Sequence, residues 1–513
     1  MKKLCWILLP LLTVGAFAQT VTNTYHSISL EECIKLALLH NRDLQIQRYE
    51  PEIARFNLRA AYGYYDPNWS LQTRRSAVSS AGAFDPEDLS GFRTYEAVSH
   101  TVNSSIRGQL PSGLSYTLTT DYAKSFGIRA GDEFDSFNSA VGISAQQPLL
   151  KNFWIDSGRM AIRINKKNLK ITELGVDYLI MQVIMQVQQA YYDLLYAHEF
   201  VRVQEQLLDL KQEFYGQTKR KVEVGALAPL QEKLAESQVA AVQADLISAR
   251  NNVALTANRL KGLLGDDFVS SVAVTLTPSD RLIVLPEQFD LQQSWRNGIS
   301  KRPDLLQMKI DVEKFEIQEK YWFNQKLPAF DIVAGYSRSG ASSSYLLYPP
   351  AVPPPSRYVP PSFASTLDQI RSGSSPSDFF GAVFSMPLTR TRERNSLLAT
   401  KQAKSQAILK VSRQEEVILK QIDDAIKSAK TYLESVTATR KAVEYAKDAL
   451  EAEKKTFEAG KSTPYTVLQL QSDLATAMSN EIQSKANYNK ALSTLFFSDG
   501  TLLDRSRIAV DVK

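Results

Sequence analysis

Two short stretches, each of which joins one long helical pattern to another, decide the fold of this chain: Val224-Gly225-Ala226-Leu227-Ala228-Pro229 and Gly460-Lys461-Ser462-Thr463-Pro464. Glycine suits the position directly after a helix, where the backbone often turns left-handed. Proline suits the first turn of the next helix, where its missing N–H costs nothing. Each stretch therefore predicts a tight turn between two antiparallel helices.

The two turns belong to an internal duplication. The later part of each half repeats at an offset of 235 positions (460 minus 225), as these pairs show: Ala190 and Ala425, Gly225 and Gly460, Pro229 and Pro464, Leu260 and Leu495. The earlier part repeats at an offset of 261 (304 minus 43): Asp43 and Asp304, Pro67 and Pro328, Trp69 and Phe330. Repetition at fixed offsets predicts two copies of one structural unit.

The segments that lead into the turns predict unusually long helices. From Asp156 to Val224 there is no proline, and at about 1.5 Å per residue such a helix measures on the order of 100 Å. Small or apolar residues recur there at spacings of four and three: Val183, Val187, Ala190, Leu194, Ala197 and Val201. This spacing is the seam of a coiled coil. Shorter return helices, near 229–264 and 464–497, complete two hairpins.

Stretches of alternating polarity lie between the helical parts. Trp69, Leu71 and Thr73 alternate with polar residues in the first half, and Phe330 and Ile332 begin the same pattern in the second. Alternation of period two predicts strands with one apolar and one polar face. Such strands fit a membrane barrel or a half-buried sheet in a soluble sandwich, and the strands alone leave both open.

The strand regions of the two halves differ. Residues 98–110 and 114–122 alternate and are joined by Pro111-Ser112-Gly113, which predicts an additional hairpin. That hairpin either adds two strands to the sheet or folds over its outer mouth. The second half is expected to carry instead an exposed loop, near 337–377, with seven prolines between Pro349 and Pro361.

The first residues have the pattern of an export signal. Lys2 and Lys3 precede an apolar stretch, and Ala16-Phe17-Ala18 has the form of a cleavage site. We expect residues 1–18 to be removed. Cys5 lies inside this signal, so the mature chain is not expected to be a lipoprotein.

Composition excludes several classes of function. A net charge of +5 in 513 residues gives no basis for a nucleic-acid partner. The four histidines are scattered and one cysteine, Cys33, remains in the mature chain, so no metal site is expected. There is no glycine-rich phosphate loop, and we expect neither a cofactor nor an enzyme. No later segment is apolar enough for a spanning helix, so membrane insertion would require a closed barrel.

In their order within the duplicated frame, the motifs resemble those of the TolC-like outer-membrane factor (outer membrane efflux protein) family. The resemblance rests on 29–41 (SLEECIKLALLHN), 147–149 (QPL), 224–227 (VGAL) and 457–463 (FEAGKST), and it covers nearly all of the mature chain. It implies an α+β membrane protein in which a homotrimer shares one outer-membrane β-barrel. A tunnel of long antiparallel α-helical coiled coils extends from the barrel into the periplasm.

The resemblance also implies a function and partners. The chain would be the channel of a tripartite efflux or type I secretion system, surrounded by outer-membrane lipid. It would receive substrates from a periplasmic adaptor (membrane fusion) protein and an inner-membrane pump of the RND or ABC type. The adaptor would dock at the two turns, on Val224, Gly225, Ala226, Leu227, Pro229, Gly460, Lys461, Ser462 and Pro464.

The gate is expected to depart from the family pattern. Well-studied relatives narrow the tunnel mouth with acidic residues at the positions of Thr466 and Gln469, and some relatives also hold it shut with an acid–base pair at the positions of Gln231 and Ser462. Here all four are uncharged, and Asp473 and Glu232 are nearby acids. We therefore expect a constriction formed by Thr466, Gln469, Asp473 and Gln231 through hydrogen bonds and packing.

The expected domains follow the duplication: 1–18 signal peptide, 19–67 helices, 68–150 strands with the additional hairpin at 98–122, 151–265 first long hairpin, 266–328 linker and helices, 329–388 strands with the proline-rich loop, 389–498 second long hairpin, and 499–513 tail. The alternative from another class is a periplasmic or surface coiled-coil interaction protein without a channel. Cargo and pump class are not encoded in these patterns.

Overall fold

The computed structural model describes residues 24–80, 95–129, 132–265, 274–347 and 357–506, which form two compact units. Unit 1 contains the described residues up to 49, 175–305 and those from 414 on, and unit 2 contains 50–174 and 306–413. Four helices contribute residues to both: α2 (Arg42–Tyr62), α3 (Ser157–Glu223), α7 (Pro303–Gln325) and α9 (Thr391–Glu458). The expected signal peptide lies outside the described residues.

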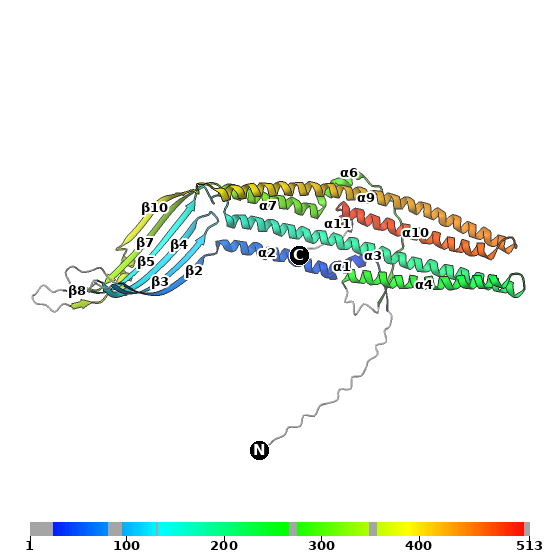
Figure 1. The fold of residues 1–513 in the computed structure, drawn as a ribbon, viewed down its shortest axis with the longest axis horizontal. Helices are drawn as coiled ribbons and strands as arrows, with labels where there is room; N and C mark the ends of the chain where they lie inside the picture. The colour runs from blue at the N-terminus through cyan, green and yellow to red at the C-terminus, as the bar shows by residue number, and fades with distance from the viewer. Residues whose placement is uncertain (1–23, 81–94, 130–131, 266–273, 348–356, 507–513) are drawn as a thin grey trace, which may run out of the picture. The chain divides into compact units, whose positions relative to one another are not determined.

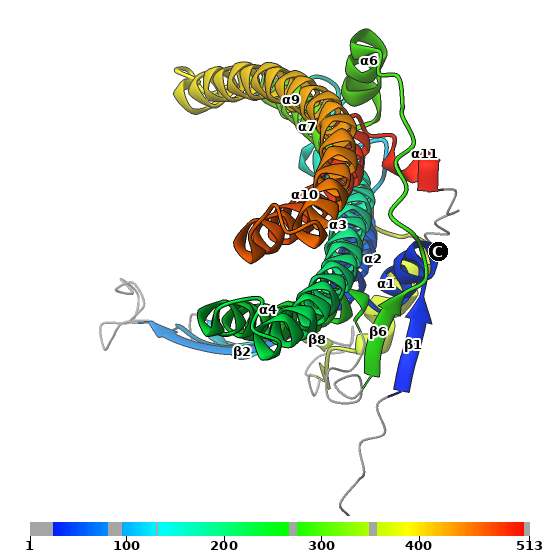
Figure 2. The same cartoon turned by 90° about the vertical axis from the view of Figure 1, so that its right-hand side faces the viewer.

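The two long helices are continuous, as their freedom from proline predicts. α3 has 67 residues and α9 has 68. In unit 1, α3 leads through the first turn into α4 (Pro229–Leu264), and α9 leads through the second into α10 (Pro464–Ser498). Figures 1 and 2 show these four helices side by side in the order α9, α10, α3, α4.

Short elements pack on this helical row within unit 1: β1 (Thr24–Ile28), α1 (Leu30–His40), β6 (Val274–Pro278), α6 (Leu291–Lys301) and α11 (Leu502–Ser506). β1 and β6 pair in parallel. Ser29 caps α1 by accepting a hydrogen bond from the Glu32 amide at 3.3 Å.

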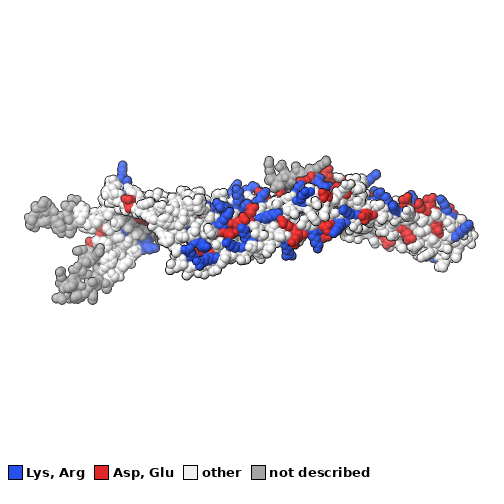
Figure 3. Space-filling view, turned by 90° about the horizontal axis from the view of Figure 1, so that it is seen from above, with Lys and Arg blue, Asp and Glu red and all other residues white. Residues whose placement is uncertain are grey.

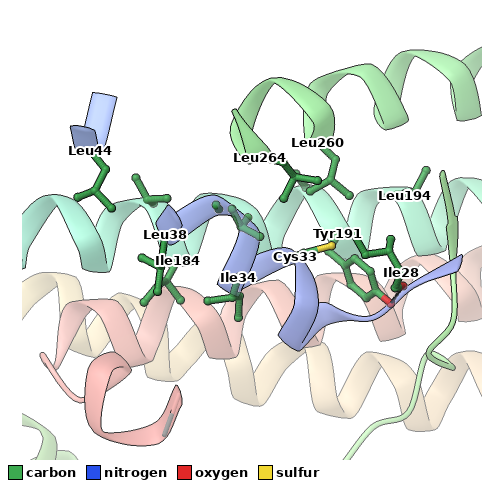
Figure 4. Packing of buried hydrophobic residues seen from close by; sticks show 14 of the residues in the cluster. Ile28, Cys33, Ile34, Leu38, Leu44, Ile184, Tyr191, Leu194, Leu260 and Leu264 are labelled. Atoms are coloured by element: carbon green, nitrogen blue, oxygen red, sulfur yellow. Dashed lines mark hydrogen bonds between the residues drawn. The ribbon is translucent and has the colours of Figure 1, made fainter. Parts of the chain in front are cut away.

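The main core of unit 1 lies where α1, α3 and α4 meet (Figure 4). Cys33 and Leu260 are fully buried against Tyr191 of α3. The Tyr191 hydroxyl donates to Asp280 Oδ2 at 2.7 Å and lies 3.1 Å from the Ile28 carbonyl oxygen. The buried hydroxyl therefore has two hydrogen-bond acceptors, one at the end of β1 and one just after β6.

The sheet of unit 2 is antiparallel, with the strand order β10-β7-β5-β4-β3-β2 (Figure 1). Its strands are β2 (Asn68–Ser80), β3 (Tyr95–Gln109), β4 (Ser115–Arg129), β5 (Asp132–Pro148), β7 (Ala329–Ser343) and β10 (Pro376–Ser385). The predicted turn at Pro111-Ser112-Gly113 joins β3 to β4, with Gly113 at φ +88°. The additional hairpin therefore lies within the sheet.

The two faces of the sheet differ in polarity, as the alternation predicts. One cross-strand row joins Trp69, Ile106, Leu118 and Ile143. The neighbouring row on the opposite face contains Ser70 and Ser105, whose hydroxyls lie 2.8 Å apart. In Figure 3, charged side chains gather over the helices and are sparse on the visible surface of the sheet.

The expectation of a loop throughout 337–377 is wrong. β7 continues to Ser343, and α8 (Phe363–Ser372) packs on the sheet. Thr366 of α8 is fully buried, and its hydroxyl lies 3.0 Å from that of Ser139 on β5. A short antiparallel pair of strands, β8 (Tyr345–Leu347) and β9 (Arg357–Val359), comes between β7 and α8 along the chain. Most of the proline-rich stretch lies outside the described residues.

The helical parts of unit 2 also form a row. Lys404 of α9 pairs with Glu316 and Glu319 of α7. Gln307 of α7 donates to the Ile171 carbonyl of α3 at 3.0 Å. None of the helices in the described parts of the chain has an apolar run long enough to cross a bilayer.

Candidate functional site: the tips of the two helical hairpins

The first tip has the backbone that the glycine–proline spacing predicts. Gly225 has φ +78°, in the left-handed region. Its amide donates to the Val222 carbonyl at 2.9 Å, and the Ala226 amide donates to the Lys221 carbonyl at 2.8 Å. These bonds satisfy carbonyls at the end of α3 that have no partner within the helix. Pro229 then occupies the first turn of α4.

The second tip repeats this geometry 235 positions later (460 minus 225). Gly460 has φ +73°, and its amide donates to the Phe457 carbonyl at 3.0 Å. The Lys461 amide donates to the Thr456 carbonyl at 3.1 Å, which is the same five-residue closure as at the first tip. Pro464 begins α10. The duplication thus extends to individual hydrogen bonds.

A small core holds the two tips together within unit 1. It comprises Phe214, Ala235, Leu450, Phe457, Val467 and Leu468, one or two from each of the four long helices. The rings of Phe214 and Phe457 lie 5.3 Å apart. The Lys221 ammonium lies 4.0 Å from the centre of the Phe457 ring, a cation–π contact between the hairpins.

Apolar side chains outside this core face solvent at the tips. Val224 is 79% exposed and Leu230 is 75% exposed, and Tyr465 of the second tip is also exposed. Leu227, by contrast, packs against the core.

The four expected gate residues fall into two groups. Thr466, Gln469 and Asp473 are exposed on α10, at spacings of three and four that place them on one helix face. Gln469 donates to Asp473 at 2.9 Å. Gln231 lies on α4, half-buried, and its Oε1 has no partner among the described residues. No hydrogen bond found among the described residues joins Gln231 to the other three.

Ser462 has a partner that the sequence did not suggest. Its hydroxyl is hydrogen-bonded to the Glu453 carboxylate of α9. This bond ties the turn back to the helix that enters it. The hydroxyl therefore restrains the second turn without forming an ion pair.

Sequence reasoning also missed a buried lysine near the tips. Lys211 of α3 is 1% exposed. Its ammonium donates to Gln238 Oε1 of α4 at 2.9 Å and to Ser472 Oγ of α10 at 2.8 Å. Burial lowers the pKa of Lys211 below its usual value. The seam spacing was the available signal, because extending it from Val201 by three, four and three residues arrives at Lys211.

Among the described residues, no three His, Cys, Asp or Glu side chains lie close enough to hold a metal ion.

The fold is that of outer-membrane channels. The CmeC outer membrane channel of Campylobacter jejuni matches with a TM-score of 0.63 at 15% identity, over 92% of this chain and 85% of that chain. The outer membrane protein VceC of Vibrio cholerae matches with a TM-score of 0.62 at 16% identity, over 92% of this chain and 96% of that chain. At such identities the likeness establishes the fold alone.

The family follows from the sequence match. The model of the outer membrane efflux protein family matches residues 112–266 and 297–501, more than half of the chain and both tips. This chain belongs to the outer membrane efflux protein family. The probable efflux pump outer membrane protein TtgC of Pseudomonas putida is 22% identical over 491 residues, which cover 93% of this chain and 86% of TtgC. The predicted family and fold class are confirmed, and the relatives are channel proteins rather than enzymes.

Proposed function

We propose that three copies of this chain form the outer-membrane duct of a tripartite efflux or type I secretion assembly. The observation that carries the proposal is the sheet of unit 2, which segregates apolar from polar residues and has two unpaired edges. A single copy leaves both edges open, and association removes them. The apolar face then meets lipid and the polar face lines a water-filled lumen.

Docking of a periplasmic adaptor is assigned to the tips, on Val224, Gly225, Ala226, Leu227, Pro229, Gly460, Lys461, Ser462 and Pro464. The exposure of Val224 and Leu230 supports this assignment. An inner-membrane pump of the RND or ABC type would deliver cargo through that adaptor. The chain itself reaches the outer membrane after removal of residues 1–18 and carries no lipid.

The gate is assigned to Thr466, Gln469, Asp473 and Gln231. Because Thr466 and Gln469 are uncharged and Gln469 donates to Asp473, the four assigned residues form a polar constriction in which Asp473 is the one acid. Such a mouth binds cations weakly compared with one that carries several carboxylates.

The deciding experiment is single-channel recording from the purified full-length protein in a planar lipid bilayer. Discrete, stable conductance steps support the duct, and small steps indicate that the pore keeps a narrow point. Folded protein that inserts but conducts no current, even after Gly225 and Gly460 are replaced to loosen the turns, contradicts the proposal. Folded protein that fails to insert supports the coiled-coil interaction protein instead.

A further inference from the structure

The two copies of the duplicated unit contribute unequally to the sheet of unit 2. The second copy supplies β7 and β10, and the first supplies β2, β3, β4 and β5. Four strands are each next along the chain to a helix of unit 2 or separated from it by a short connection: β2 from α2, β5 from α3, β7 from α7 and β10 from α9. The other two, β3 and β4, have no helix of their own and lie between β5 and β2.

The β3–β4 hairpin is fully integrated into the sheet. Every residue from Ser115 to Arg129 of β4 is paired with β3 on one side and with β5 on the other. Its turn is held at the base of the sheet, where Gln147 donates to the Ser112 carbonyl at 3.3 Å. Pro111 lies beside the end of α2 and the start of α3, in a small cavity lined by Tyr62, Tyr65, Arg159, Ile162 and Arg163.

Six strands also match the width of the helical row in unit 2. Four helices packed about 8–10 Å apart occupy roughly 32–40 Å. Six strands spaced about 4.8 Å apart and tilted by about 40° occupy roughly 38 Å of circumference, whereas four such strands occupy about 25 Å. The hairpin therefore fills the width that four strands would leave uncovered at an ordinary tilt.

The two edges of the sheet are complementary. In an antiparallel sheet of six strands the outer two, β2 and β10, run in opposite directions. Every residue of β2 is exposed, as is every residue of β10 except Gly381. The cross-strand registers place Trp69 and Leu71 of β2 on the same face as Phe380 and Phe384 of β10. An apolar band would therefore continue from β10 of one copy to β2 of the next.

We propose that β10 of one copy pairs antiparallel with β2 of the next, and that three copies of six strands close a barrel of 18 strands. The proposal rests on the trimeric duct proposed above and adds its seam and its width. Each copy offers one edge of each kind, so the same β10–β2 contact can repeat, and three copies close a ring when each is rotated by a third of a turn from the last. A barrel of about 18 strands encloses an aqueous channel.

Cysteine cross-linking of the full-length protein tests the seam. In a Cys33→Ala background, Ala382→Cys on β10 is combined with Leu71→Cys on β2, and then with Trp69→Cys or Thr73→Cys to follow the register. Facing residues of antiparallel strands lie within disulfide reach. The expected result is oxidant-dependent covalent dimers and trimers that reducing agent returns to monomer. Gln72→Cys, on the opposite face of β2, is the matched control and is expected not to link.

A second set of pairs tests whether the hairpin lies in the barrel. Leu118 and Ile143 face each other across β4 and β5, so Leu118→Cys with Ile143→Cys is expected to link within one chain. Leu71→Cys with Ile143→Cys is expected not to link, because β3 and β4 separate them. A Leu71–Ile143 link within one chain, or 12 strands in a cross-section of the trimer imaged by electron microscopy, overturns the proposal.

Bilayer recordings of the same variants separate the two proposals. Conducting protein with a Leu71–Ile143 link retains the duct and overturns the 18-stranded barrel. Protein with no seam link, no insertion and no current overturns both. Conducting protein with the Ala382–Leu71 link and no Leu71–Ile143 link supports both.

Discussion

Replacing Gly225 by alanine tests the account of the tips, because the structure separates backbone strain from steric conflict there. Gly225 has φ +78°, and an added Cβ would meet no atom within 4 Å. The cost of Gly225→Ala is therefore that of a left-handed alanine, about 1–2 kcal/mol. Gly216 lies within α3 and is equally open. Gly216→Ala is expected to stabilise the same helix by about 0.8–1 kcal/mol.

The two variants make the same chemical change a few residues apart, but Gly225→Ala is expected to lower local stability and Gly216→Ala to raise it. Amide hydrogen exchange measured by mass spectrometry over the tip peptides reports the local opening that each change alters. A difference of about 2 kcal/mol between them corresponds to roughly 30-fold in the opening constant. Gly225→Ala is expected to speed exchange at the tip, and Gly216→Ala to slow it.

Gly460→Ala provides an internal check, since Gly460 has φ +73° and is also open. It is expected to behave like Gly225→Ala. Slower exchange at the tip in either turn variant would refute the argument, because the turn would then not need a residue that tolerates the left-handed region.

Three further predictions concern charge. Burial lowers the pKa of Lys211 in the folded protein below its usual value of 10.5. Between the folded-state pKa and 10.5 the unfolded chain therefore binds more protons than the folded one, and stability is expected to rise with pH up to about 10.5. Melting temperatures of Lys211→Met, measured from pH 7.5 to 10.5, are expected to lack this rise. Burial raises the pKa of the Cys33 thiol from 9.0 to about 12, so its contribution is complete below pH 9 and is lost as pH rises toward 12; Cys33→Ala is expected to flatten that fall, and an unchanged slope would contradict it. Thr466→Asp adds one carboxylate per copy at the expected constriction, and block of single-channel current by polyvalent cations is expected to strengthen by about 1 kcal/mol, roughly fivefold, per acid contacted.

Features that depend on local backbone requirements could be predicted from the sequence. The turns follow from glycine and proline at Gly225, Pro229, Gly460 and Pro464, because those residues favour one conformation with little help from the rest of the fold. The two faces of the sheet follow from alternation in the same way. The duplication then connects these local predictions, since each feature occurs twice in the same order.

Features that depend on contacts between distant segments were missed. α8 has 10 residues, too few to be stable alone, and it is held by the Ser139–Thr366 contact and by a bond from Gln369 to the Ala341 carbonyl. Its short pattern beside the prolines indicated a loop. The strand count depended on whether the β3–β4 hairpin pairs with β5, and alternation alone does not choose a neighbour.

Lys211 shows how a buried polar group changes the interpretation of the gate. Thr466 and Gln469 are hydrogen-bonded to Thr463 and Asp473 of the same tip segment, so these bonds do not tie one hairpin to the other. Lys211 does so, because its ammonium bonds both α4 and α10. A lysine at a seam position fixes the register of helices at a cost in stability. We infer that the two hairpins separate only when these Lys211 bonds break together with the contacts of the tip core, which includes Phe214 and Phe457.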